Sequence, residues 1–239
     1  YGIEVQDDKK NNYIFLSPFS DYTEILNKKS ISYLSKKKNL CFKFISPKII
    51  KNPNIALDGY VHRLYFKNYN QWKNNIADYR FKRYLKENYK VGIEIKIENS
   101  NKILSDFYYL FKKQRFLKFS KLSQPKTFFY KIYQSYISKN DGFIISAFIK
   151  KKLVSSIIFI LDREKKIAFY KYVCNDRKYK VKTSNILISE SIKKLYKLKI
   201  NKIFFDFSSF SSKGLIKFKE SIGCNRYYRY IYRDKNYFL

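Results

Sequence analysis

Hydrophobic positions follow helix or strand periodicity along most of the chain after residue 68. The run 69–88 has helical spacing with apolar residues on two faces, which is typical of a helix that lies between two bodies. The segment VGIEIKIE at 91–98 alternates and predicts a strand, and two helices follow it, the second with Pro125 in its first turn. Before residue 68 the periodicity is weaker, and prolines divide the segment into short strands and turns.

The second half of the chain predicts a meander of three strands, followed by a helix, a strand, a second helix and a last strand. The expected bounds are 143–149, 153–161 and 168–173 for the meander, 184–198 for the helix, 202–207 for the strand, 213–222 for the second helix and 226–233 for the last strand. The meander is expected to be antiparallel, and the strand that follows the first helix is expected to run parallel to its predecessor. The pattern therefore predicts a mixed sheet covered by helices on both faces.

Basic residues dominate the composition. Lysine and arginine number 51 against 19 acidic residues, a formal charge of +32, so the surface attracts polyanions. Lys, Asn, Ile, Phe and Tyr also have A/T-rich codons, and part of this composition follows from codon bias alone. Three separated cysteines and one histidine do not match a zinc-binding spacing, so we expect no metal site.

The same composition bears on the location of the protein. Few cysteines favour a reducing compartment, and no apolar run is long enough to span a bilayer. We expect a cytoplasmic protein, and contact with the inner face of the membrane stays open.

The stretch FFDFSSFSSKGLIKFKESIG, residues 204–223, carries the most informative chemistry. On its helix, Leu215, Phe218 and Ile222 are expected to form the buried stripe. Lys219 then lies at the edge of that stripe, where an ammonium must reach water or an anion. Asp206 lies near the end of the preceding strand, beside a serine-rich loop, which is where open sheets bind ligands. A carboxylate at that point either orients an attacking amine or accepts its proton, or it only caps the turn.

Together with LSPFSDYTE at 16–24 and FYYLFKKQRFLKF at 107–119, this stretch resembles the FemAB-like branch of the GNAT acyltransferase superfamily. The resemblance covers nearly the whole chain. It implies an α+β GNAT-like acyl-CoA N-acyltransferase fold, a mixed sheet flanked by helices, with two lobes of which the first is incomplete. The implied domains are a remnant of the first lobe at 1–68, a connecting helix at 69–90 and a complete GNAT-like domain at 91–239.

The resemblance also implies an activity. An acyl or aminoacyl group moves from acyl-CoA or aminoacyl-tRNA onto an amine of an anionic cell-envelope precursor or polysaccharide, such as a peptidoglycan precursor, by direct attack without a covalent enzyme intermediate. In this family the lysine that matches Lys219 stabilises developing negative charge, and the arginine that matches Arg115 faces an anionic substrate group. The complete expected site is Lys219 and Asp206 as catalytic residues, Arg115, Gln114, Tyr172, Ser208 and Lys213 for substrate, and Arg177, Lys182, Ser184 and Asn185 for the donor.

Plainer interpretations of these residues stay open. Lys219 is then a snorkelling side chain, and Arg115 only complements a helix end. The loop 174–185 lacks the glycines of a pyrophosphate grip, so its basic run either favours a bulkier donor such as tRNA or is a solvated charged segment. Cys174 and His62 are expected to be structural, since no nucleophile–base pattern includes them.

Two further alternatives concern the whole chain. The segment 225–234 alternates arginine with tyrosine and is expected on an edge strand, either as a platform for phosphates and bases or as a half-buried strand. The rival to a transferase is a non-catalytic basic module that binds RNA or another polyanion. A transferase is expected to hold Lys219 and Asp206 in a cleft between lobes, whereas such a module presents a flat positive stripe.

Overall fold

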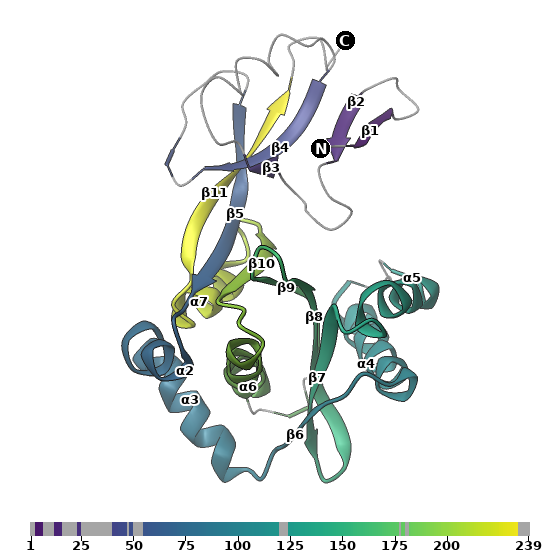
Figure 1. Cartoon of the computed structure of the whole chain (residues 1–239), viewed down its shortest axis with the longest axis vertical. Coiled ribbons are helices and arrows are strands. Elements are labelled where there is room, and N and C mark those ends of the chain that lie inside the picture. The colour runs from purple at the N-terminus through teal and green to yellow at the C-terminus, as the bar shows by residue number, and fades with distance from the viewer. Residues whose placement is uncertain are drawn as a thin grey trace. The chain divides into compact units, whose positions relative to one another are not determined.

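The computed structural model describes residues 3–6, 12–15, 23–24, 40–46, 48–49, 55–119, 124–176, 178–179 and 182–233. The chain divides into two compact units, whose elements are labelled in Figure 1. Unit 1 contains Tyr1–Arg63, Asp206–Glu220 and Cys224–Leu239, and unit 2 contains Leu64–Phe205 and Ser221–Gly223. The predicted lobes are a different division of the chain and stay a prediction.

Unit 2 is built on a mixed sheet. Its strands follow the order β10-β9-β8-β7-β6, where β10 begins in unit 2 and ends in unit 1. Their bounds are Glu94–Ile97 for β6, Gly142–Ile149 for β7, Lys152–Asp162 for β8, Ile167–Asn175 for β9 and Lys202–Ser208 for β10. Strands β6 to β9 pair antiparallel, and β10 pairs parallel with β9, which confirms the predicted meander and the crossover.

Helices cover both faces of this sheet. Their bounds are Tyr69–Gln71 for α2, Tyr79–Lys90 for α3, Asn101–Phe119 for α4, Lys126–Ile132 for α5 and Thr183–Lys197 for α6. Figure 1 shows α4 and α5 on one side of the strands and α6 on the other, with α2 and α3 against α6. The apolar runs of β7 and β8 are buried because both of their faces are covered, as in the fully buried Ile144, Ile157 and Ile158. No helix in the described part of the chain combines the length and apolar character needed to cross a bilayer.

The predicted helix at 69–88 is interrupted. A π-helical turn, η1 (Trp72–Ile76), follows α2, and Ala77 is extended before α3 begins. The break rotates the second part of the segment, so that Phe81 is buried and Tyr79 is 75% exposed, where continuous helical spacing had placed Tyr79 on a buried face. A second π-turn, η2 (Tyr133–Ile137), follows α5.

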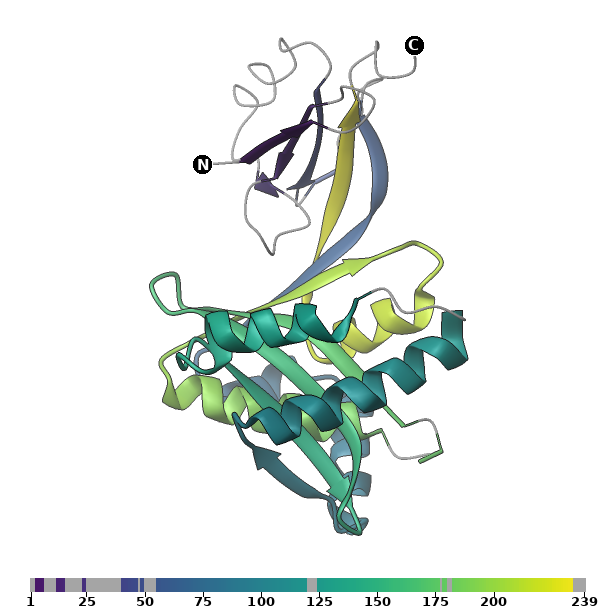
Figure 2. The ribbon, with the colours of Figure 1, turned by 90° about the vertical axis from the view of Figure 1, so that its right-hand side faces the viewer.

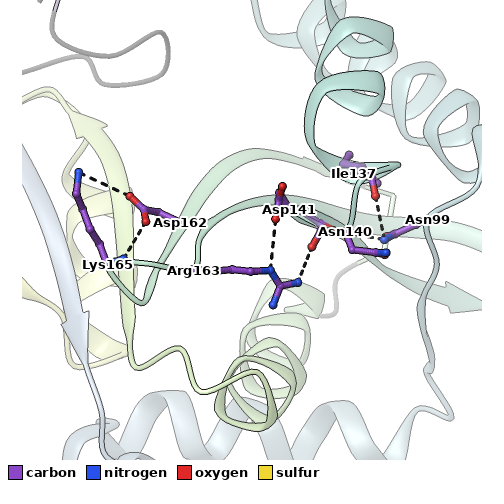
Figure 3. A network of polar contacts seen from close by, with 8 residues as sticks. Asn99, Ile137, Asn140, Asp141, Asp162, Arg163 and Lys165 are labelled. Atoms are coloured by element: carbon purple, nitrogen blue, oxygen red, sulfur yellow. Dashed lines mark hydrogen bonds and ion pairs between the residues drawn. The ribbon is translucent and has the colours of Figure 1, made fainter. Parts of the chain in front are cut away.

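Polar side chains secure the connections of unit 2 (Figure 3). The Asn99 amide, just after β6, donates to the carbonyl oxygens of Ile137 and Gly142 at 3.4 and 3.3 Å. Its oxygen accepts from the Ile144 backbone N–H at 3.3 Å. In the same view Arg163 reaches Asp141 at 3.3 Å, so the chain before β7 is tied to the turn after β8. A hydrogen bond of the Asn99 kind is worth about 1 kcal/mol, and an exposed ion pair such as Arg163–Asp141 is worth about that or less.

Unit 1 contains a second group of strands and the helix α7 (Lys213–Ser221), except that the last residue of α7 and the last two residues of β5 belong to unit 2. The strands are β1 (Ile3–Gln6), β2 (Asn12–Phe15), β3 (Thr23–Glu24), β4 (Leu40–Ser46), β5 (Ile55–Tyr65) and β11 (Asn225–Arg233). Their order is β1-β2-β4-β11-β5, with β3 beside β4. The stretch 16–24, used for the family resemblance, lies outside the described residues except for β3.

Strand β11 corrects one prediction. It pairs antiparallel with β4 on one side and with β5 on the other, so it is an interior strand and not an edge strand. Alternation of arginine and tyrosine resembles an edge because both side chains tolerate partial exposure, but here both edges of the backbone are hydrogen-bonded.

Candidate active site

The helix α7 buries its lysine more deeply than the sequence predicts. Ile216 and Lys219 are 7% and 3% exposed, whereas Leu215, expected in the buried stripe, is 42% exposed. The buried face is therefore shifted by one residue, and Lys219 lies at its centre instead of its edge. Lys213 and Lys217 are exposed, as the predicted helix orientation requires.

The ammonium of Lys219 is oriented by strand β10. Its Nζ donates to the backbone carbonyl of Asp206 and, at 2.9 Å, to the hydroxyl of Ser208. Burial lowers the pKa of Lys219 to about 8, although the nearby negative charge of Asp206 opposes this change. The Asp206 carbonyl and the Ser208 hydroxyl are neutral acceptors that hold the ammonium in place.

A buried histidine lies in the same electrostatic environment. His62 on β5 is opposite Arg226 on β11 and is fully buried. Neither ring nitrogen has a hydrogen-bond partner among the described residues. Burial, together with the positive charges of Lys219 and Arg226, lowers the pKa of His62 to about 3, so the ring is neutral at physiological pH. The sequence prediction treated His62 as structural; its place in an alternating strand was the only local signal.

An ion pair fastens α7 to β11 beside this group. The Arg226 guanidinium donates to the Glu220 carboxylate, with Nε at 2.9 Å from Oε1, and its central carbon lies 4.6 Å from the centre of the Tyr60 ring. The pKa of Arg226 is raised, first by its hydrogen bond to Glu220. Because Glu220 immediately follows Lys219, this pair limits rotation of the helix and helps to hold the lysine in position.

The end of β10 is braced from β5 and β11. Arg229 is 5% exposed, pairs with Asp58, and its guanidinium carbon lies 3.3 Å from the centre of the Phe207 ring. Gly59 approaches so closely that an added Cβ would lie 2.6 Å from the carbonyl oxygen of Ser208. These contacts determine where the Ser208 hydroxyl meets Lys219.

Unit 2 brings together a second group of the predicted residues. Arg115 on α4 has its guanidinium carbon 4.9 Å from the centre of the Phe111 ring, and burial lowers its pKa while Tyr172 acts in the opposite direction. Tyr172 on β9 also contacts Phe129, with ring centres 5.1 Å apart. Gln114, next to Arg115, is half-buried. Arg115 and Tyr172 therefore both lie against the Phe111 ring, and their role toward a substrate stays a prediction.

We expected donor-binding residues at the start of α6. Several polar groups there form hydrogen bonds with other groups of the protein. The Ser184 hydroxyl donates to Asn175 Oδ1 at 3.0 Å, and Asn175 also accepts from Ser155 at 2.6 Å. The backbone N–H of Asn185 donates to the Lys182 carbonyl at 3.0 Å, and the Lys182 side chain is exposed. Arg177 lies outside the described residues. A backbone N–H that is already bonded is a weaker anchor for pyrophosphate.

Cys174 and Cys224 are both buried. Burial raises the pKa of each thiol far above its usual range, so neither supplies a thiolate at physiological pH. Both thiols therefore behave as small apolar side chains.

Comparisons with known proteins bear on the fold. No protein-family model matches the sequence, and no curated protein matches it by sequence. Among solved structures, FemX matches with a TM-score of 0.68 and 11% identity, covering 98% of this chain and 84% of that chain. L-PGS from Bacillus licheniformis matches with a TM-score of 0.58 and 9% identity over the same two shares, 98% and 84%.

A third structure is the C-terminal domain of a protein assigned as a lysylphosphatidylglycerol synthetase of Agrobacterium fabrum. It matches with a TM-score of 0.61 and 7% identity and again covers 98% of this chain and 84% of that chain. Each match spans nearly all of the chain, and the identities are low enough that the likeness concerns architecture. The chain therefore has the FemAB-like GNAT fold that its sequence predicted.

Proposed function

We propose that the protein is an N-acyltransferase or aminoacyltransferase that modifies an amine of an anionic cell-envelope precursor or polysaccharide. The observation that carries this proposal is Lys219, an ammonium buried in an apolar helix face and oriented by the Asp206 carbonyl and the Ser208 hydroxyl. A fixed, desolvated cation stabilises negative charge that develops in a transition state more strongly than an exposed one does.

The reaction is a direct acyl transfer. The acceptor amine attacks the carbonyl carbon of the donor, and a carbon–nitrogen bond forms while the bond to the leaving oxygen of an aminoacyl ester, or to the leaving sulfur of a thioester, breaks. The amine loses one proton, and the leaving group gains one. Lys219 offsets the negative charge on the carbonyl oxygen or on a neighbouring phosphate during this step.

Two other residues have positioning roles. The half-buried carboxylate of Asp206 is assigned to orient the incoming amine. Arg115, with its guanidinium held against Phe111, is assigned to bind an anionic group of the acceptor, because its forked donors suit a phosphate or carboxylate.

An aminoacyl-tRNA donor is favoured over acyl-CoA. The segment 174–185 contains no glycine, and the Asn185 N–H is already bonded to the Lys182 carbonyl, so this turn offers a poor grip for the CoA pyrophosphate. A chain with a net charge of +32 suits a large polyanion such as tRNA. One similar structure is assigned as a synthetase of lysylphosphatidylglycerol, a product in which an aminoacyl group is joined to an anionic molecule.

The test is acyl transfer by the wild-type protein and by Lys219→Ala, with aminoacyl-tRNAs and acyl-CoAs supplied as separate donors. We expect Lys219→Ala to lower the transfer rate by about 100-fold or more. The matched control is Lys217→Ala, an exposed lysine on the same helix, which is expected to retain the wild-type rate. Because the charged form is needed, the wild-type rate is also expected to fall as pH rises through about 8.

A near-normal rate for Lys219→Ala would sink the assigned mechanism. If the wild-type protein transfers no acyl group from any donor but binds RNA with an affinity that falls steeply with salt, the rival binding module is the correct function.

A further inference from the structure

The outer side of α4 exposes apolar side chains that do not pack against the sheet of unit 2. Tyr109, Phe116 and Leu117 are 73%, 47% and 70% exposed. Tyr109, the exposed Lys112 and Phe116 follow at spacings of three and four, with Leu117 beside them, so the four residues form one stripe along the helix. We call this stripe the α4 outer face. Figure 2 shows α4 and α5 side by side across the sheet.

The charge around this face is mainly positive, with the exposed Asp106 one turn before Tyr109 as an acidic exception. From Phe107 to Asn140 the sequence contains eight lysines and arginines and no acidic residue. Lys112 carries its ammonium 5.9 Å from the centre of the Phe116 ring, and Lys126 on α5 lies 5.5 Å from the Tyr130 ring. A cation therefore lies beside the exposed Phe116 ring, and another lies beside the half-buried Tyr130 ring. Cations next to apolar side chains suit the boundary between anionic headgroups and acyl chains.

The kind of side chain favours lipid over RNA as the occupant. Leu117 has no flat face on which a base stacks, and the ring of Phe116 already lies against the Lys112 ammonium. An aliphatic side chain with 70% of its surface in water gains most from transfer into an apolar phase. Apolar insertion and electrostatic attraction together supply the two signals that stable peripheral binding requires.

We infer that the α4 outer face docks the protein on membranes rich in anionic phospholipid, with Phe116 and Leu117 entering the headgroup boundary and the neighbouring lysines contacting headgroup phosphates. This inference stands on the surface of unit 2 alone and does not depend on the proposed transferase activity.

The test is co-sedimentation of the protein with vesicles of phosphatidylglycerol mixed with phosphatidylcholine, and with vesicles of phosphatidylcholine alone. We expect the wild-type protein to bind only the anionic vesicles. Phe116→Ser combined with Leu117→Ser should weaken that binding by about tenfold or more, because both apolar contacts are lost. Lys112→Gln combined with Lys126→Gln should weaken it as well, by about fivefold or more.

Matched controls distinguish the effect of the α4 outer face from the effect of exposed aromatic residues or positive charge elsewhere in unit 2. Tyr79→Ser combined with Tyr196→Ser removes two aromatic side chains that are 75% and 50% exposed elsewhere in unit 2, and it should bind as the wild type does. Lys150→Gln combined with Lys151→Gln removes the same two charges from an exposed turn and should have less effect than the α4 and α5 pair.

A spectroscopic variant covers the case in which the serine variant does not fold. In Leu117→Trp, emission should shift to the blue on anionic vesicles, against a constant background from the buried Trp72. The inference is overturned by an unshifted Leu117→Trp, by wild-type binding to neither vesicle, or by full binding of a folded serine variant. Binding of single-stranded RNA through Phe116 and Leu117 in place of vesicles would overturn it equally.

Discussion

The buried charge of Lys219 lowers the stability of the folded protein. It is 3% exposed, and the Asp206 carbonyl and the Ser208 hydroxyl that accept hydrogen bonds from it are neutral. Its pKa of about 8 lies below the ordinary lysine value of 10.5 because burial disfavours the charged form. The difference corresponds to roughly 3 kcal/mol against the folded, charged state at neutral pH. A residue that opposes folding by this amount is more readily explained by function than by stability.

Replacement of this lysine should show how much its buried charge lowers the unfolding free energy. Lys219→Met keeps the side-chain length and removes the buried charge, so we expect it to be about as stable as the wild type at pH 7, or more stable. Between pH 8 and 10.5 the unfolded wild-type chain binds more protons at this lysine than the folded chain, so wild-type stability rises with pH there by up to about 1.4 kcal/mol per pH unit. Lys219→Met lacks this gain. Denaturant unfolding of both proteins across this range measures it.

The comparison needs an exposed lysine as its reference. Lys217→Met removes a solvated charge from the same helix and should follow the wild-type pH dependence. A constant stability difference between the wild type and Lys219→Met from pH 7 to 10.5 would contradict the lowered pKa.

The sequence located this lysine but not its surroundings. A lysine three residues before Ile222 in an apolar helix was visible from spacing alone. Leu215 and Ile216 are adjacent and equally apolar, so the choice between them depended on which side of α7 meets the strands. The neutral state of His62 was hidden for the same reason, because it arises from burial and from charges on α7 and β11.

At the scale of elements, the site depends on how closely β5 approaches the end of β10 within unit 1. Gly59 has no side chain, and that absence lets its backbone lie against the Ser208 carbonyl. Arg229 and Asp58 support the same region through their ion pair. The position of the Ser208 hydroxyl is therefore a property of three strands together.

A methyl group at position 59 should disturb this arrangement. In Gly59→Ala the new Cβ would fall 2.6 Å from the Ser208 oxygen, so the strands must separate. We expect a loss of about 1–3 kcal/mol in unfolding free energy, measured by denaturant titration. Gly214→Ala is the matched control, because a Cβ there meets nothing within 4 Å and alanine favours the helix. Equal stabilities for the two variants would show that the close approach is not required.

Regular elements were predictable, and their irregularities were not. The strands from β7 to β10 and the helix α6 lie within two residues of their predicted bounds, because their periodicity is strong. The break at Ala77 could not be predicted, because the sequence on both sides of it has helical periodicity and no proline or glycine marks the break. The interior place of β11 depends on pairing with β4 and β5, which lie far from it in the sequence.

At the scale of the whole molecule, the net charge of +32 should govern encounter with substrate. Given the proposed transferase activity, kcat/KM for an anionic acceptor should fall as salt is raised, since the screening length shrinks from about 10 Å at 0.1 M to about 3 Å at 1 M. The value of kcat should change less, because Lys219 is shielded from solvent. Initial rates with an anionic and an uncharged amine acceptor measure this, and equal salt dependence for both acceptors would rule out electrostatic steering.

The sequence by itself determined the order of helices and strands, the mixed sheet and the presence of a lysine on an apolar helix face. It did so because these features depend on local periodicity and on short runs of neighbouring residues. Only the tertiary structure decided that Lys219 lies at the centre of that face, that it meets the Asp206 carbonyl and the Ser208 hydroxyl, and that His62 stays neutral nearby. Those facts arise from contacts between strands and a helix distant in the chain, and burial and charge at a site are the sum of such contacts.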